Sequence, residues 1–317
     1  MVRGACRPPL RVRGARRRLP TLASLAALLA AALWACLLAC TRAPPTRPSR
    51  PDRIVSLAPA ITETLFAIGA GNRVVGVSDY CDHPPEVKSL PKAGSSLTPN
   101  YEAIVGLKPG LVLGERAKGT PSDELSAIAP AVLLPWLSLA DVIASTRELG
   151  ELTGCEAAAE QLADRLSERL SRPPPAGAPR VLLVLGADPA QMTDVWFIRR
   201  DSIHGEALEA AGARNAVAED VEGPPNLSIE RVIGLDPDVV LILVTADPLA
   251  PEVEARHLAG WRALPIAAAK RGAVRVIHGK GIESTGPRIL DLVEKLAAAL
   301  REAAPPAPPA PPAPLHP

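Results

Sequence analysis

Short runs of consecutive apolar residues alternate along the chain with segments in which apolar residues recur every three or four positions. The unbroken runs predict strands buried on both sides of a sheet, and the helical spacing predicts the covering helices. Strands are expected at 53–57, 74–77, 111–113, 132–134, 181–185, 239–244 and 274–277, and helices at about 59–68, 102–107, 123–129, 141–152, 156–171, 202–211, 229–235 and 287–302. This alternation predicts an α/β protein with parallel sheets.

One phrase of the sequence occurs in both halves of the chain. Residues 102–113 (EAIVGLKPGLVL) return as residues 230–241 (ERVIGLDPDVVL), and a second pair, 65–72 and 208–215, keeps the same order. A repeat of more than 100 residues is too long for a solenoid. It predicts two similar lobes whose sheets face each other across a cleft, with Glu102 and Glu230 in equivalent places.

The stretch between the halves, residues 139–172, contains no strand signal. It predicts two helices divided at Thr153-Gly154, of which the second is about 24 Å long. That length is enough to cross from the first lobe (53–138) to the second (179–302), so we expect a single rigid bridging helix and a cleft that opens by a small angle. The Pro/Ala-rich end, 303–317, predicts a disordered tail.

The N-terminal segment differs from the rest in composition. Residues 1–20 carry seven arginines and no acidic residue, and an uncharged run of 18 residues ends at Ala39. This order is typical of a secretory signal, although 18 apolar residues can also just span a bilayer as an uncleaved anchor. The ending Leu-Leu-Ala-Cys40 resembles the bacterial lipobox. That resemblance implies a signal peptide over 1–39, a lipid on Cys40 and a Pro-rich linker over 40–52.

Removal of residues 1–39 changes the charge balance. It takes away seven of the 35 basic residues and none of the 34 acidic ones, which leaves 28 basic and 34 acidic side chains and a net charge of −6. An acidic chain without a basic stripe argues against nucleic acid as a partner. Besides Cys40, the mature thiols are Cys81 and Cys155, and the sequence leaves open whether they form a disulfide.

Three stretches carry a resemblance to a known family: residues 53–63 (RIVSLAPAITE), 74–85 (VVGVSDYCDHPP) and 100–109 (NYEAIVGLKP). With the bridging helix and Gly286-Pro-Arg288, they resemble the helical-backbone substrate-binding proteins of ABC importers. That group includes the vitamin B12 and ferric-siderophore receptors, and the likeness to the B12 receptors is the strongest. The resemblance covers residues 53–300. It implies a monomeric, non-enzymatic receptor that delivers a small molecule to a homodimeric permease with ATPase subunits.

The repeated glutamates acquire a role through this resemblance. In the family, one surface glutamate per lobe pairs with arginines of the permease, and Glu102 and Glu230 fall on those positions. A two-fold permease presents two equivalent basic pockets, which two equivalent carboxylates can match. The alternative is that each glutamate only stabilises the first turn of its helix through the helix dipole.

The ligand contacts are sought among few aromatic residues, since the mature chain has only seven. Tyr80 follows a predicted strand, where α/β sheets place ligand contacts. The resemblance matches Tyr80 to the tyrosine that packs on the corrin ring of the B12 receptors, and Trp196 to another aromatic of that pocket. Trp136 ends the last strand of the first lobe and is expected to wall the cleft, although an aromatic residue at a strand end can also belong to the core.

The polar anchors of the B12 receptors are missing here. Residues 95–97 (Ser-Ser-Leu) stand where those receptors have a tryptophan, and Lys280 and Ser284 replace an acidic and a basic contact. Candidates to hold anionic oxygens instead are Arg199, Arg200 and Arg288, with a solvated surface charge as the alternative for each. The predicted ligand is a corrinoid, and a ferric siderophore or haem is the alternative.

Other chemistries fit the sequence poorly. Gly69-x-Gly71 follows a predicted helix and lacks the third glycine of a dinucleotide fingerprint. The histidines of the mature chain are far apart in sequence, which predicts no metal site, and no nucleophile–base set predicts a catalytic residue. The sequence therefore predicts an exported receptor, lipid-anchored to the bacterial envelope and facing the periplasm or outer surface, that needs no cofactor.

Overall fold

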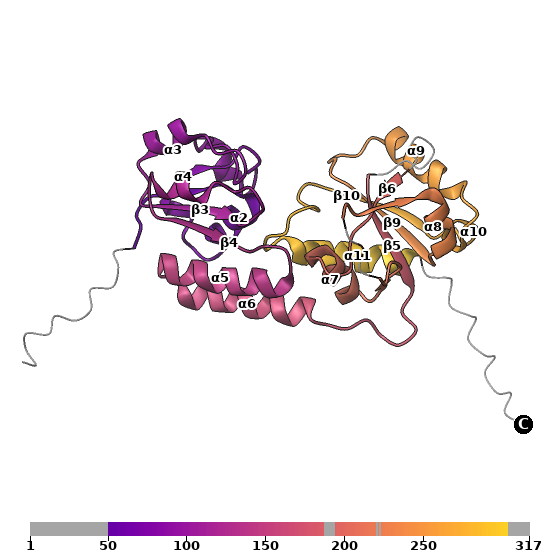
Figure 1. Ribbon diagram of the computed structural model, residues 1–317. Helices are drawn as coiled ribbons and strands as arrows, with labels where there is room; N and C mark the ends of the chain where they lie inside the picture. The colour runs from indigo at the N-terminus through magenta and orange to yellow at the C-terminus, as the bar shows by residue number, and fades with distance from the viewer. Residues whose placement is uncertain (1–49, 187–193, 220, 222, 304–317) are drawn as a thin grey trace, which may run out of the picture. The chain divides into compact units, whose positions relative to one another are not determined.

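The computed structural model describes residues 50–186, 194–219, 221 and 223–303 (Figure 1). The predicted signal peptide, Cys40, most of the linker and nearly all of the Pro/Ala tail lie outside the described residues. Among the helices that are described, none combines the length and the apolar character needed to cross a membrane.

The first lobe is built on a parallel four-stranded sheet with the order β2-β1-β3-β4. Its central strands β1 and β3 are buried along nearly their whole length, as expected for unbroken apolar runs. Helices α2, α3 and α4 connect the strands in turn. The elements are β1 (Ile54–Ser56), α2 (Pro59–Ala67), η1 (Gly71–Arg73), β2 (Val74–Val77), η2 (Pro85–Ser89), α3 (Tyr101–Leu107), β3 (Leu111–Glu115), α4 (Ser122–Ser126) and β4 (Ala131–Leu134).

The second lobe contains a parallel sheet of order β10-β9-β5-β7 and a small antiparallel pair, β6 and β8. Its elements are β5 (Arg180–Leu185), β6 (Asp194–Trp196), α7 (Ile203–Ala210), β7 (Arg214–Asn215), β8 (Asn226–Ser228), α8 (Ile229–Leu235), β9 (Val239–Val244), α9 (Pro251–Arg262), α10 (Ala267–Lys270), β10 (Val274–His278) and α11 (Ile289–Ala303). The parallel α/β prediction is therefore confirmed in both lobes.

The two sheets repeat one topology. Strands β5, β7, β9 and β10 occupy the places of β1, β2, β3 and β4, so the order of the second sheet is that of the first. The repeated sequence phrase falls on α3–β3 and on α8–β9. Both helices end at a residue in the left-handed region, Lys108 (φ 47°) and Asp236 (φ 43°), each directly before a proline. The internal repeat predicted from the sequence is confirmed by this shared geometry.

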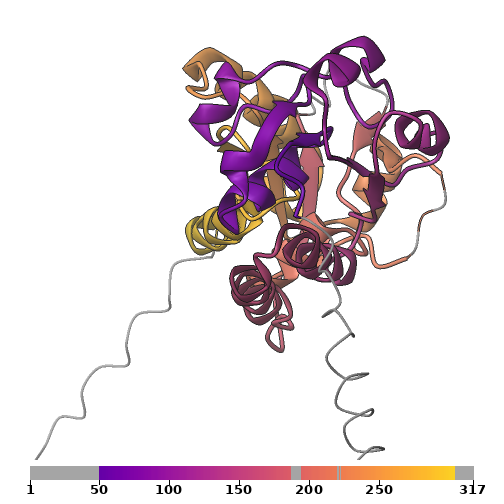
Figure 2. The same cartoon turned by 90° about the vertical axis from the view of Figure 1, so that its left-hand side faces the viewer.

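Two helices of 15 residues connect the lobes, α5 (Leu139–Thr153) and α6 (Glu156–Leu170), and the turn between them uses Gly154 at φ 67°. Both lie side by side (Figures 1 and 2), packed closely enough that a Cβ on Gly150 would approach Ala159 Cβ within 2.5 Å. Helix α6 begins next to Arg73 of the first lobe and ends where Arg169 pairs with Glu294 of α11. The predicted crossing helix is thus present, but α5 reinforces it, so the bridge is a helical hairpin.

Several elements of the second lobe were not expected from the sequence. The polar helix α9 buries only Gly260 and Trp261, so its apolar periodicity is weak. The β6–β8 pair joins two three-residue strands that are far apart in the chain. The final helix begins at Ile289 and not at residue 287, because the preceding segment makes the contacts described below.

Candidate functional site

An exposed tyrosine stands on a firmly held loop at the carboxyl edge of the first sheet. Tyr80 follows β2, and its side chain is 74% exposed. The Lys92 ammonium group donates to the carbonyl oxygens of Ser78 (3.2 Å) and Cys81 (2.7 Å), and Cys81 N donates to Ser78 O at 3.1 Å. The loop is therefore fixed by internal hydrogen bonds while its one aromatic ring faces solvent.

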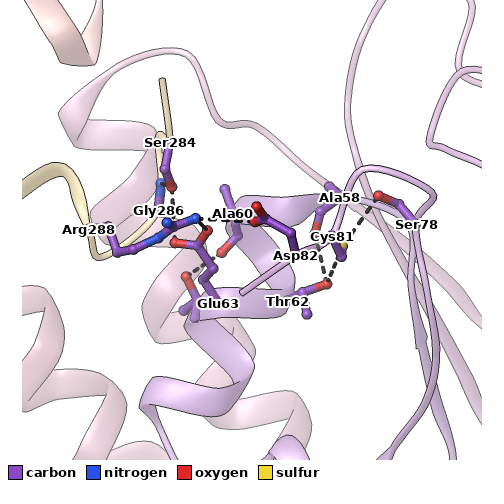
Figure 3. A network of polar contacts seen from close by, with 11 residues as sticks. Ala58, Ala60, Thr62, Glu63, Ser78, Cys81, Asp82, Ser284, Gly286 and Arg288 are labelled. Carbon is purple, nitrogen blue, oxygen red and sulfur yellow. Dashed lines mark hydrogen bonds and ion pairs between the residues drawn. The ribbon is translucent and has the colours of Figure 1, made fainter. Parts of the chain in front are cut away.

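The inner side of this loop is anchored through Cys81, which is buried. Its sulfur lies 3.2 Å from Thr62 Oγ1 and 3.3 Å from Ser78 Oγ (Figure 3). Cys155 lies instead beside Arg73, and both thiols are free. Cys81 therefore serves the loop as a small buried anchor, and the two cysteines do not form the disulfide that the sequence left open.

Two further apolar side chains share the carboxyl edge, Leu97 and Leu137, and both are exposed. The turn that carries Leu97 is tied to the sheet by Ser96, whose buried hydroxyl donates to Leu57 O (3.1 Å) and accepts from Glu115 N (2.9 Å). We call Tyr80, Leu97 and Leu137 the carboxyl-edge patch. The two leucines were missed as candidates. Leu137 follows a predicted strand, which was a usable signal, and Leu97 belongs to the stretch 95–97 that stands where the B12 receptors have a tryptophan.

Glu115 adds a carboxyl group to this edge. It is the last residue of β3, and burial raises the pKa of its carboxyl group above the usual value. A carboxyl group at this edge can donate a hydrogen bond to a bound molecule when it is protonated, and it can accept one in either state. No local pattern in the sequence indicates this environment, because the burial of Glu115 depends on the neighbouring turn.

In the second lobe, Trp196 ends β6 and is 46% exposed between the buried side chains of Val195 and Phe197. It pairs with Asn226 of β8. The Arg199 guanidinium donates to the carbonyl oxygen of Gly223 and is partly exposed. Both residues therefore remain accessible, as their predicted role in ligand contact requires.

Trp136 and Arg288 have a different environment from the one predicted. Trp136 is only 4% exposed, and its Nε1 donates to Thr285 O at 3.0 Å. The Arg288 guanidinium is paired with the carboxylate of Glu63. Both side chains are thus engaged in holding the segment between β10 and α11 against the first lobe.

The Glu63–Arg288 pair is the centre of a polar network (Figure 3). The Glu63 side chain is 3% exposed and that of Arg288 19%. Ser284 Oγ also donates to Glu63 Oε2 at 3.0 Å, and Asp82 lies 3.8 Å from the guanidinium. The hydrogen bond to Glu63 and the surrounding carboxylates raise the pKa of Arg288. We call this network the Glu63 latch.

A related contact occurs at the other end of the bridge. Glu206 of α7 occupies the place in the second lobe that Glu63 of α2 holds in the first, and its Oε2 accepts from the backbone nitrogen of Leu139 (2.8 Å), the first residue of α5. Burial is the main cause that raises the pKa of Glu206. Each lobe therefore places a carboxylate of its first helix at the start of the helix that follows the other lobe's sheet.

One hollow, of about 360 Å³, borders the latch. It is lined by Glu63, Phe66, Ala67, His83, Pro84, Glu86, Pro287 and Arg288. Of the predicted ligand contacts only Arg288 belongs to it. In the described part of the chain, no group of three or more His, Cys, Asp or Glu side chains is arranged to hold a metal ion.

The two repeated glutamates occupy equivalent exposed positions. Glu102 is the second residue of α3, whose N-cap Asn100 accepts from Ala103 N (3.0 Å). Glu230 is the second residue of α8, whose N-cap Ser228 accepts from Arg231 N (3.3 Å). Hydrogen bonds from its own backbone nitrogen and from Ser228 lower the pKa of Glu230. Both glutamates are exposed in the first turn of a short capped helix.

Comparison with known proteins identifies the family. A family model described as "Periplasmic binding protein" matches residues 54–277. The chain belongs to this family. It is a solute-binding protein and not an enzyme, and the sequence resemblance is confirmed at this level.

Individual relatives cover most of the chain. An uncharacterized ABC transporter substrate-binding lipoprotein of Bacillus subtilis is 30% identical, over 79% of this chain and 80% of its own length. A cobalamin-binding protein of Halobacterium salinarum is also 30% identical, over 80% of this chain and 70% of its own.

Two solved structures share the fold. A periplasmic heme binding protein of Pseudomonas aeruginosa has a TM-score of 0.64 at 26% identity and covers 80% of this chain and 94% of its own. A periplasmic vitamin B12 binding protein of Vibrio cholerae has a TM-score of 0.63 at 26% identity, and the match covers 81% of this chain and 99% of that protein's chain. The fold thus agrees equally well with two classes of tetrapyrrole-binding receptor.

Proposed function

We propose that this chain is the substrate-binding component of an ABC importer and that it captures a corrinoid. The family and the Bacillus lipoprotein support the importer role. The observation that carries the ligand class is Tyr80, an exposed aromatic ring on a loop that the protein holds rigid. With Leu97, Leu137 and, in the second lobe, Trp196, it offers the flat apolar contacts that a corrin macrocycle requires. The cobalamin-binding relative points the same way.

Haem or a ferric siderophore is the second candidate. The heme binding protein with the same fold supports it. Arg199 follows Trp196, the last residue of β6, by three residues and is partly exposed. Its guanidinium group could therefore bind a propionate or another anionic oxygen. A corrinoid and haem share a flat macrocycle, and they differ in peripheral charge.

Calorimetry on residues 41–317, the exported chain without its lipidated cysteine, tests the ligand class. We expect sub-micromolar binding of cyanocobalamin, and a comparison with cobinamide tells whether the lower axial base is recognised. Binding of haem, seen as a shifted Soret band, with no heat from either corrinoid would replace the corrinoid by haem. Binding of ferric siderophores alone would support the importer role and replace the corrinoid by a siderophore as the transported ligand.

Docking to the permease is assigned to Glu102 and Glu230, and anchoring to a lipid on Cys40. Each glutamate lies in the first turn of a capped, exposed helix, in equivalent positions of the two lobes, which suits a two-fold partner with two basic pockets. The receptor then acts as a monomer on the outer side of the membrane, with the permease and its ATPase subunits as partners.

Charge reversal tests the docking assignment. The double variant Glu102→Lys, Glu230→Lys should abolish corrinoid uptake by cells and keep the affinity for cyanocobalamin, because neither glutamate is among the proposed ligand contacts. Normal uptake by the double variant contradicts the assignment. Release of the Cys40→Ser variant into the soluble envelope fraction tests the lipid anchor.

A further inference from the structure

Three positions on each repeated helix face solvent together. In α3 they are Glu102, Val105 and Gly106, and in α8 they are the equivalent Glu230, Ile233 and Gly234. Residues spaced i, i+3 and i+4 lie on one side of a helix. The position between them, Ile104 or Val232, is fully buried against the sheet. Each helix thus presents one exposed stripe, and we call these the α3 stripe and the α8 stripe.

The middle of each stripe is aliphatic. Val105 is 55% exposed and Ile233 is 36% exposed. A single exposed aliphatic side chain is ordinary on a protein surface. Here the same exposure occurs at the same position of both repeats, one helical turn after the glutamate, in lobes whose sequences otherwise differ widely.

The glycine of each stripe has no role that the described chain explains. Of the exposed glycines in the described residues, only Gly106 and Gly234 combine a φ outside the left-handed region with no atom within 4 Å of an added Cβ. A glycine inside a helix destabilises the helix relative to alanine. Neither the backbone conformation nor packing within the protein requires a glycine at these two positions. A glycine would, however, let another molecule approach the helix backbone closely.

Both helices are fixed at each end, which keeps the stripes in place. Their N-caps are Asn100 and Ser228. At the other end, Arg53 Nη2 donates to Leu107 O (2.7 Å), and Arg180 Nη2 donates to Leu235 O (2.8 Å). These arginines precede or begin the first strand of each sheet, so the clamp is repeated with the topology. A cation at the last carbonyl oxygen also complements the helix dipole.

We infer that the two stripes are the complete docking elements for the permease, with a carboxylate, an aliphatic contact and a glycine against which the partner packs closely. The inference rests on the docking role proposed for Glu102 and Glu230. The partner that fits is a two-fold membrane protein presenting, twice, a cation next to a small apolar surface. At each stripe, the glycine leaves room for an element of the partner to approach the helix backbone of the receptor.

Bulky substitution of the glycines separates docking from the fold. The variant Gly106→Leu, Gly234→Leu places side chains in open space, so its melting temperature should stay the same or rise, and its affinity for cyanocobalamin should not change. Its affinity for the importer's permease and ATPase subunits in lipid nanodiscs should fall by about tenfold or more. The control is Ala157→Leu, an exposed position of α6 outside both stripes, which should dock normally.

Three comparisons decide the result. Loss of docking in the glycine variant and in Val105→Ser, Ile233→Ser supports the stripes. Normal docking of the glycine variant, while Glu102→Lys, Glu230→Lys fails to dock, overturns the stripes and leaves the glutamates as docking residues. Normal docking of all three variants overturns the stripes together with the docking role from which they were inferred.

Discussion

The two lobes share their sheets and the helices α3 and α8 and differ at the carboxyl edge. Both sheets have the same strand order, and α3 and α8 have the same length, the same capped start and the same left-handed end. The carboxyl edges have no such correspondence: Tyr80 stands on a loop after β2, whereas Trp196 stands on the β6–β8 pair, which the first lobe lacks.

The partners proposed for each region account for this difference. A permease with two-fold symmetry presents the same surface twice, so selection favours the same helix twice. A corrinoid or haem has two unlike faces and unlike substituents, so the two lobes need not contact it in the same way. The proposed function therefore assigns the repeated surface to the symmetric partner and the divergent surface to the asymmetric ligand.

The contacts at the bridge combine both behaviours. Glu63 and Glu206 occupy equivalent helices and each reaches the start of the other lobe's final helix. Glu63 is almost fully buried and pairs with a guanidinium, whereas Glu206 accepts a backbone N–H and is partly exposed. Equivalent positions therefore carry two contacts that differ in kind and in burial.

The largest expected effect is at the Glu63 latch. Arg288→Ala leaves a buried carboxylate without its counter-charge, which should lower the free energy of unfolding by about 3–5 kcal/mol. Urea denaturation followed by circular dichroism measures this. If the variant does not fold, Glu63→Gln with Arg288→Met, which removes both charges, should restore folding.

Matched variants at the other contacts sharpen the comparison. Glu206→Ala removes one hydrogen bond and should cost about 1 kcal/mol, and Arg169→Ala at the exposed α6–α11 pair about 1 kcal/mol or less. Equal losses for Arg288→Ala and Glu206→Ala would show that the two contacts do not differ as their burial indicates.

The next effect concerns the two aromatic ligand contacts. Tyr80→Ala and Trp196→Ala should each weaken ligand binding by about 1–3 kcal/mol, because each removes an exposed ring that stacks on the macrocycle. Calorimetry with cyanocobalamin measures both. Tyr101→Ala, an exposed aromatic of α3, serves as the control and should leave the dissociation constant unchanged; a Tyr80 variant with unchanged affinity would remove Tyr80 from the site.

A further comparison tests the equivalence of α3 and α8. Asn100→Ala and Ser228→Ala each remove an N-cap hydrogen bond and should cost about 1 kcal/mol of unfolding free energy. The two losses should agree closely, and both should reduce docking to the permease, since a frayed first turn misplaces Glu102 or Glu230. Loss of docking from one cap variant alone would show that the lobes do not contribute equally.

Much of the fold was predictable because it depends on local signals. Unbroken apolar runs located the central strands of both sheets, and the predicted ranges 74–77 and 239–244 coincide with β2 and β9. Helix α9 escaped prediction because only its last turn is buried. The β6–β8 pair escaped because its register depends on two segments distant in sequence.

By itself, the sequence determined the repeated topology, the family and the equivalence of Glu102 and Glu230. A repeat and a capped helix each depend on residues that are consecutive in the chain, so both can be recognised without the tertiary structure. Only the tertiary structure decided which candidate side chains are available. Trp136, Arg288 and Tyr80 all follow predicted strands or occur in family motifs, yet Trp136 is enclosed by the segment before α11, Arg288 pairs with Glu63, and Tyr80 is exposed. Burial depends on which distant segments pack over a residue, and no local pattern around these three residues specifies that.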